Sequence, residues 1–181
     1  MTTEELLALP EHGIDRELVR GQLREREITR CNPMHSAVEA NVARILGNWS
    51  VACPEPRGRV LSGEAGFRIR REPDTTVGID VAYIDAATCA RIPKNAALID
   101  APPVLAVEIL SPSDKQEEIL ANVQDYLESG VMLVLLLEPV FETVTVYRPD
   151  APPTLLSGTQ ELSADNHLPG FRCAEREFFH A

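Results

Sequence analysis

Two acidic residues interrupt otherwise apolar runs of the sequence, in a pattern that could do chemistry. Asp80 opens the run DVAYI, and Glu108 lies near the end of the run VLAVEIL. A carboxylate in such a setting is costly unless it is paired with a charge or bound to a cation. Two neighbouring strands that carry one carboxylate each could hold Mg²⁺ or Mn²⁺ through oxygen ligands and waters. The spacing alone leaves a salt bridge or a solvated strand end as alternatives.

Several other kinds of chemistry lack their sequence motifs. The chain contains no G-x-x-x-x-G-K-[ST] phosphate loop and no strand followed by G-x-G-x-x-G. It also contains no G-x-S-x-G nucleophile elbow and no H-E-x-x-H zinc motif. Nucleotide-dependent and serine-hydrolase reactions are therefore unsupported, and the acidic pair is the main candidate for chemistry.

A long block around Glu108 resembles a known family. The block APPVLAVEILSPSDKQEEILANVQDYLESGVMLVLLLEP is similar to the hallmark segment of the Uma-two family of restriction endonucleases, a branch of the PD-(D/E)XK superfamily. Further matches are NPMHSAVEANVARIL, GEAGFRI, IDVAYI and HLPGF, which together span nearly the whole chain. The resemblance implies one α/β domain over residues 1–181 with the restriction-endonuclease-like fold, a central mixed sheet flanked by helices. It also implies an endonuclease that hydrolyses phosphodiester bonds in nucleic acid with the help of Mg²⁺ or Mn²⁺.

The resemblance implies specific roles for residues of this sequence. Asp80 becomes the motif aspartate and Glu108 the motif glutamate, both of them metal ligands and catalytic residues. The backbone carbonyl of Ile109 becomes a third metal ligand, and Glu64 a possible outer acidic ligand. The usual proline before the motif aspartate is replaced by Ile79. The literal dipeptide Pro73-Asp74 lies in a polar turn, so we favour Asp80 over Asp74 as the motif aspartate.

The expected catalytic lysine is missing. The family has Leu-type residues where E-x-K would place its lysine, as Leu110 does here, and the following helix usually supplies the lysine instead. The aligned position in that helix is Asn122, and Lys115 opens the same helix. Lys115 could substitute, Asn122 could orient a water less effectively, or catalysis could be lost. The last case would leave a catalytically degenerate nuclease-fold protein that acts as a binding or regulatory module.

Other residues could contact the substrate. His35 matches a histidine often present at the start of the early helix in the family, where helix capping or packing is an equal alternative to a phosphate or water contact. A basic stretch that includes Arg68 and Arg70 is the one plausible phosphate-binding footprint in the sequence. Solvated charges on an edge strand are the alternative interpretation of these arginines.

The hydrophobic periodicity predicts the elements that must position these residues. We expect a β-hairpin over 17–28 with a turn at Arg20-Gly21, and a loop over 86–103. Ser113 is the predicted cap of the helix that follows Glu108, and the apolar run Val131 to Leu137 predicts a central strand. The predicted helices cover 2–9, 33–51 and 114–128, and the predicted strands cover 59–61, 66–70, 79–84, 104–110, 131–137 and 142–147, with one or two short strands and a final turn in the tail.

Composition and charge place limits on location and partners. The chain has 181 residues and a formal charge of −11, of which −2 belongs to residues 1–100 and −9 to residues 101–181. An acidic chain repels polyphosphate, so binding to nucleic acid needs a local basic patch or bound cations. No apolar run is long enough to span a membrane, and the N-terminal residues do not resemble a secretory signal, so we expect a cytoplasmic protein. The four cysteines are expected to be free thiols, and the resemblance implies a homodimer that binds DNA.

Overall fold

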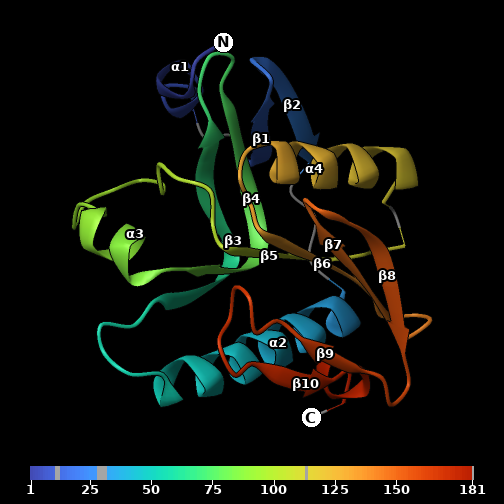
Figure 1. Ribbon diagram of the computed structural model, residues 1–181. Coiled ribbons are helices and arrows are strands. Elements are labelled where there is room, and N and C mark those ends of the chain that lie inside the picture. Colours follow the sequence, from blue (N-terminus) through green and yellow to red (C-terminus); the bar gives the residue numbers. More distant parts are fainter. Residues whose placement is uncertain (11–12, 28–31, 113, 181) are drawn as a thin grey trace.

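The computed structural model describes residues 1–10, 13–27, 32–112 and 114–180. Its centre is an eight-stranded mixed sheet with helices on both faces (Figure 1). The strands follow the order β2-β1-β4-β5-β6-β7-β8, and β3 pairs with β4 outside this path. The helices are α1 (Thr3–Leu7), α2 (Pro33–Ala52), α3 (Ala86–Arg91) and α4 (Gln116–Glu128), with a 3-10 turn η1 (Glu175–Phe178). The strands are β1 (Ile14–Val19), β2 (Gln22–Glu27), β3 (Arg59–Arg70), β4 (Thr75–Ile84), β5 (Leu105–Ile109), β6 (Leu133–Glu138), β7 (Thr143–Arg148), β8 (Ala151–Ser157), β9 (Glu161–Ser163) and β10 (Arg172–Ala174).

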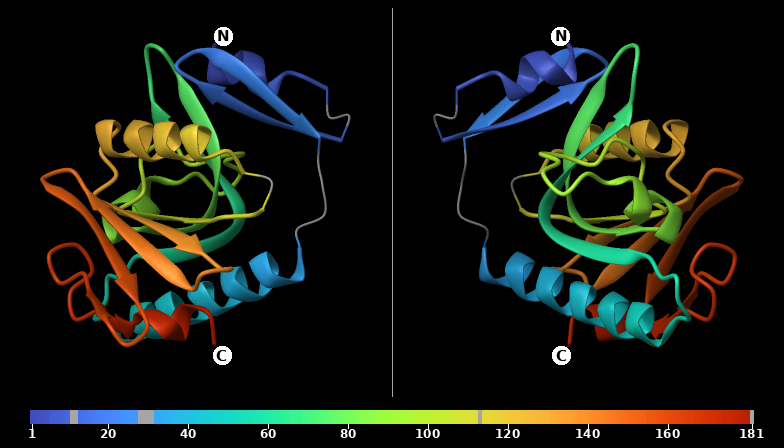
Figure 2. Two further views of the ribbon diagram at one scale, coloured as in Figure 1. Left: turned by 90° about the vertical axis from the view of Figure 1, so that its right-hand side faces the viewer. Right: turned by 90° about the vertical axis from the view of Figure 1, so that its left-hand side faces the viewer.

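Two apolar cores lie on opposite faces of the sheet. On one face, Val42 and Leu46 of α2 pack with Val107 of β5 and with the C-terminal segment. On the other face, Val123 and Tyr126 of α4 pack with residues of β4, β5 and β6. Figure 2 shows α2 and α4 on opposite sides of the sheet. The run LVLLL of β6 is buried throughout because both of its faces are covered, as predicted for a central strand.

The N-terminal hairpin forms one edge of the sheet, where β1 pairs with β4, and its turn contacts α4. Its turn is formed by Arg20 and Gly21, both with positive φ, as the sequence predicts for a tight hairpin turn. The guanidinium of Arg20 then reaches α4, where its Nε donates to Asp125 Oδ1 at 2.6 Å. It also contacts Glu128 Oε2 at 2.9 Å. These contacts fix the hairpin against the helix that follows the Glu108 strand.

Three predictions about elements before the tail are wrong. Residues 86–103 include the helix α3, which Asp85 caps through a 2.7 Å hydrogen bond from the Thr88 amide. The two strands predicted at 59–61 and 66–70 form the single strand β3, with a register shift between Ser62 and Ala65. The helix α4 begins at Gln116 with Lys115 as its N-cap residue, later than predicted. The predicted cap Ser113 lies outside the described residues.

The tail forms the three strands β8, β9 and β10 instead of the predicted one or two, and the other predicted elements are confirmed with shifted ends. The helix α2 begins at Pro33 after Asn32, whose side chain accepts a hydrogen bond from the His35 amide at 2.9 Å. The strand β4 is longer than predicted and begins at Thr75. Among the described cysteines, Cys53, Cys89 and Cys173 are free thiols. Within the described ranges, no helix combines the length and apolar character needed to cross a membrane.

Candidate active site

Asp80 and Glu108 lie opposite each other on adjacent strands. The antiparallel pairing of β4 with β5 sets Val81 against Val107, so the next pair along the same register is Asp80 and Glu108. Asp80 is only 7% exposed, and Glu108 is partly buried. The fold therefore brings together the two carboxylates that the sequence singled out.

Asp80 is oriented by two neighbours. Its Oδ2 accepts a hydrogen bond from the backbone amide of Ile109 at 2.7 Å, and it lies 3.3 Å from Nε2 of His35. His35 lies in the first turn of α2, and this turn places its imidazole beside Asp80 of β4. The Asp80 carboxylate raises the pKa of His35 and so favours the imidazolium form. His35 Nδ1 is buried with no hydrogen-bond partner among the described residues.

Glu108 is held by a tyrosine of α4, the helix that covers the other face of the sheet from α2. The hydroxyl of Tyr126 on α4 donates to Glu108 Oε1 at 2.7 Å. Burial raises the pKa of Glu108 well above its ordinary value, and the nearby Asp80 carboxylate raises it further. The Tyr126 hydrogen bond acts in the opposite direction because it stabilises the carboxylate form. Two carboxylates that are close together and poorly solvated repel each other, and a bound cation would offset this repulsion.

Glu64 and Glu17 extend the acidic cluster. Glu64 lies within the register shift of β3 with a φ of 53° and packs over Gly78, where an added Cβ would lie 3.3 Å from Glu64 Oε2. Burial raises the pKa of Glu64, as do the charges of Asp15 and Asp80. Burial also raises the pKa of Glu17 on β1. Glu17 Oε2 lies 3.7 Å from Arg26 Nη2 on the paired strand.

The donor set fits a hard divalent cation of the magnesium type. Within the ranges that the structure describes, no group of three or more His, Cys, Asp or Glu side chains is arranged to hold a metal ion. Mg²⁺ commonly binds through one or two carboxylates, and waters and substrate phosphates complete its coordination. Asp80 and Glu108 match that pattern, whereas a soft ion would need thiolate or imidazole ligands.

The two helix residues expected to serve catalysis have other partners. Lys115 is 77% exposed, and its Nζ lies 2.9 Å from Glu118 Oε1. Asn122 Oδ1 accepts a hydrogen bond from Arg24 Nη1 of β2 at 2.9 Å. Both side chains therefore face the region between α4 and the hairpin.

Arg68 and Asp74 belong to a structural network at the turn between β3 and β4. Arg68 is 8% exposed and bonds to Asp100 at 2.7 and 2.8 Å and to Glu4 at 2.6 Å. Asp74 Oδ2 accepts hydrogen bonds from the amide and hydroxyl of Thr3, at 2.8 and 2.7 Å. The pairing of Arg68 with Thr76 places it several residues along the ladder from Asp80.

Arg70 is also occupied, because its Nη2 lies 3.2 Å from Glu128 Oε2. The expected phosphate contacts of Arg68 and Arg70 would compete with these ion pairs. The pairing of Asp74 with α1 supports Asp80 as the motif aspartate.

Some residues at the site were not singled out from the sequence. Tyr126 lies on the apolar stripe of α4, where a core role is expected; it is buried, and its hydroxyl also holds Glu108. Glu17 and Arg24 lie in the predicted hairpin and were not singled out as charged residues. The signal that could have found them is the spacing of Arg24 and Arg26, which puts two cations on one face of a strand.

Comparisons with known proteins bear on the fold and on the family. A solved structure from Anabaena variabilis, described as "a putative nuclease belonging to DUF820", superposes with a TM-score of 0.81 at 21% sequence identity, and the match covers 99% of this chain and 97% of that one. That similarity shows the fold. Comparison with curated proteins gives no match. The family model of Uma2, described as "Putative restriction endonuclease", matches residues 3–176. The chain belongs to the Uma2 family, as the sequence resemblance predicted, and this membership supports a nuclease function.

Proposed function

We propose that the protein is a divalent-metal-dependent endonuclease of the restriction type that hydrolyses phosphodiester bonds in DNA. The observation that carries the proposal is the pairing of Asp80 and Glu108 on adjacent strands. Their carboxylates would hold Mg²⁺ or Mn²⁺, with the Ile109 carbonyl as a further ligand and Glu64 as an outer acidic ligand. The chemistry that such an ion supplies is polarisation of a phosphoryl oxygen and activation of water.

The chain's own residues prepare the site for that chemistry. The Ile109 amide and His35 fix the orientation of Asp80, and Tyr126 fixes that of Glu108. Ligands with a fixed orientation would hold the phosphodiester and the attacking water in the geometry needed for reaction, which lowers the entropic cost. His35 in its imidazolium form adds a positive charge beside Asp80, which offsets part of the repulsion between that carboxylate and an approaching phosphate.

A cleavage assay tests the proposal. We expect Asp80→Asn and Glu108→Gln each to abolish nicking of supercoiled plasmid in Mg²⁺ or Mn²⁺, because each removes one charged ligand. Asp150→Asn makes the same chemical change at an exposed position and should cleave like the wild type. Cleavage that persists in both site variants would refute the assignment.

One observation favours a second candidate function. The helix position that usually supplies a lysine is Asn122, and Lys115 is paired with Glu118. A protein with this site could bind nucleic acid and metal without turnover, as a binding or regulatory module. Wild-type protein that binds Mn²⁺ and DNA and cleaves neither DNA nor RNA would support this candidate.

The resemblance also implies a homodimer, in which two sites would act on the two strands of a duplex. This remains a proposal. A molecular mass of two chains in light scattering is the expected result, and a mass of one chain would contradict it.

A further inference from the structure

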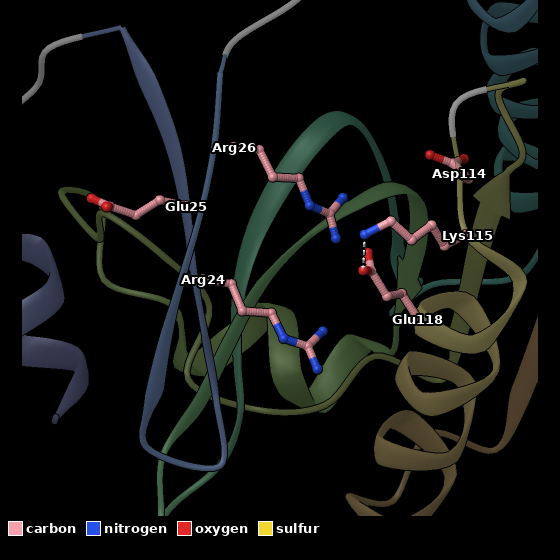
Figure 3. A pocket seen from close by; sticks show the side chains of 6 residues that line it. All are labelled: Arg24, Glu25, Arg26, Asp114, Lys115 and Glu118. Atoms are coloured by element: carbon pink, nitrogen blue, oxygen red, sulfur yellow. Dashed lines mark hydrogen bonds and ion pairs between the residues drawn. The ribbon is translucent and has the colours of Figure 1, made fainter.

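A pocket of about 520 Å³ lies between the hairpin strand β2 and the start of α4. Figure 3 shows Arg24 and Arg26 pointing from the hairpin toward Lys115 and Glu118 on the helix side. Three of the six lining residues are cationic and three are acidic, so the lining is balanced in charge although the chain as a whole has a net charge of −11. The lining residues are Arg24, Glu25, Arg26, Asp114, Lys115 and Glu118.

The two arginines share one face of β2 because they are two residues apart. The register pairs Arg24 with Glu17, and Arg26 with Asp15. Directly paired residues of an antiparallel ladder lie on the same face, so this hairpin face carries both acidic and basic groups. The hydrogen bond of Arg24 to Asn122 shows that this face is turned toward α4.

Arg24 makes no close ion pair among the described residues, although its charge favours the carboxylate forms of Glu17 and Glu118 from a distance. Its hydrogen-bond partner Asn122 is a neutral amide, and no carboxylate among the described residues lies within 4.0 Å of its guanidinium nitrogens. Lys115, in contrast, is paired with Glu118. A guanidinium presents five donors, so the bond to Asn122 leaves others free for a phosphate.

The position of Asn122 links Arg24 to the carboxylate pair. Asn122 and Tyr126 are four residues apart on α4, so their side chains lie on one face, one turn from each other. Tyr126 donates to Glu108 from that face. The guanidinium held by Asn122 is therefore placed about one helical turn from the residue that contacts Glu108.

We propose that Arg24, positioned by Asn122, contacts the phosphate of the nucleic acid beside the carboxylate pair and supplies the cation that α4 lacks. The inference rests on the proposed nuclease function. A phosphodiester approaching Asp80 and Glu108 meets several carboxylates, and a nearby guanidinium offsets their repulsion and stabilises the charge that develops on the phosphoryl oxygens. Arg26 and Lys115 line the same pocket but are paired with Glu17 and Glu118, so the contact is assigned to Arg24.

A binding experiment tests the phosphate contact without relying on cleavage. The probe is a short fluorescein-labelled DNA duplex, followed by fluorescence anisotropy with Ca²⁺ in place of Mg²⁺. Arg24→Gln should weaken binding and lower the slope of log affinity against log salt concentration by about one, as expected for one lost phosphate contact. Arg172→Gln removes the same charge from an exposed arginine on β10 and serves as the control. Equal affinity and an equal slope in Arg24→Gln and the wild type would overturn the inference.

A charge transposition tests the catalytic role. Arg24→Gln should lower kcat/KM for plasmid nicking by about 10²-fold, and the double variant Arg24→Gln/Asn122→Lys should recover most of that loss, because it returns a cation from the helix. The Mn²⁺ affinity should stay unchanged in both variants. A double variant as slow as Arg24→Gln would mean that Arg24 acts only through the packing of the hairpin.

The two proposals fail in different ways. Wild-type protein that neither binds nor cuts DNA would refute the nuclease function, and the inference with it. Wild-type protein that cuts DNA, together with an Arg24→Gln variant that binds and cuts equally well, would refute the role of Arg24 alone.

Discussion

The two aspartates that compete for the motif position should respond in opposite ways to removal. Asp74 accepts two short hydrogen bonds from Thr3 and ties α1 to β4, and its side chain is 11% exposed. Hydrogen bonds to a charged group contribute about 1.5–3 kcal/mol each, and water can replace part of this at a partly exposed site. Asp74→Ala should therefore lower the free energy of unfolding by about 2–3 kcal/mol. For a chain of this size, that corresponds to a Tm lower by about 5–10 °C.

The loss should depend on pH in a defined direction. The hydroxyl and amide of Thr3 hold the pKa of Asp74 below its usual value, because they stabilise the carboxylate. A carboxylate with a depressed pKa in the folded state contributes stability above its unfolded pKa of about 3.9. That contribution is lost as the pH falls through the folded pKa. The difference in stability between the wild type and Asp74→Ala should thus be constant near neutral pH and shrink below about pH 4.

Urea denaturation followed by circular dichroism measures the stability, and calorimetric titration with Mn²⁺ measures metal binding. Asp74→Ala should keep the Mn²⁺ affinity of the wild type, whereas Asp80→Asn should lose it without a comparable loss of stability. Asp150→Ala, at an exposed position, is the control for a lost carboxylate. Undiminished stability in Asp74→Ala, or loss of Mn²⁺ binding in that variant, would refute the assignment of the two residues.

Three further outcomes are expected. Arg68→Ala should lower the free energy of unfolding by about 2–3 kcal/mol in urea titrations, because it removes two hydrogen bonds to Asp100 and one to Glu4. The affinity for the DNA duplex should stay within the range of the Arg172→Gln control, and a large loss of DNA affinity would restore Arg68 as a substrate contact. Tyr126→Phe should weaken Mn²⁺ binding by about 10–100-fold in calorimetry, as is typical when a residue that orients a ligand is removed; unchanged binding would show that Glu108 needs no support. Mn²⁺ at 100 times its Kd should stabilise the wild type by about 2.7 kcal/mol in thermal melts and leave Asp80→Asn/Glu108→Gln unaffected, and an equal shift in both proteins would place the ion elsewhere.

Much of the fold could be predicted because its elements have clear periodicity. The helix α2 carries apolar residues at three- and four-residue spacing, and β6 is apolar on both faces because both are covered. The helix α3 was missed because it has only six residues and no apolar stripe, so its Asp85 cap was the one available signal. The shift in β3 at Gly63 and Glu64 was missed because Gly63 indicates a break between two strands in the sequence, whereas its positive φ marks a bulge within one strand.

The candidate site was predictable where burial conflicts with charge. Asp80 and Glu108 stand out because a carboxylate in an apolar run demands a partner. Arg24 did not stand out, because alternating charges are ordinary on a hairpin and only the docking of the hairpin on α4 gives it a role. Arg68 was expected to contact phosphate, whereas the structure pairs it with carboxylates. The sequence does not reveal this pairing, because the partners lie 64 and 32 residues away in the chain.

Calorimetric titration of Mn²⁺ into the wild type and into Asp80→Asn/Glu108→Gln tests the central claim most directly. The account predicts saturable binding in the wild type that disappears in the double variant, while circular dichroism shows that both proteins are folded. Equal binding by the two proteins, or no binding by the wild type, would contradict the claim that Asp80 and Glu108 form a divalent metal site.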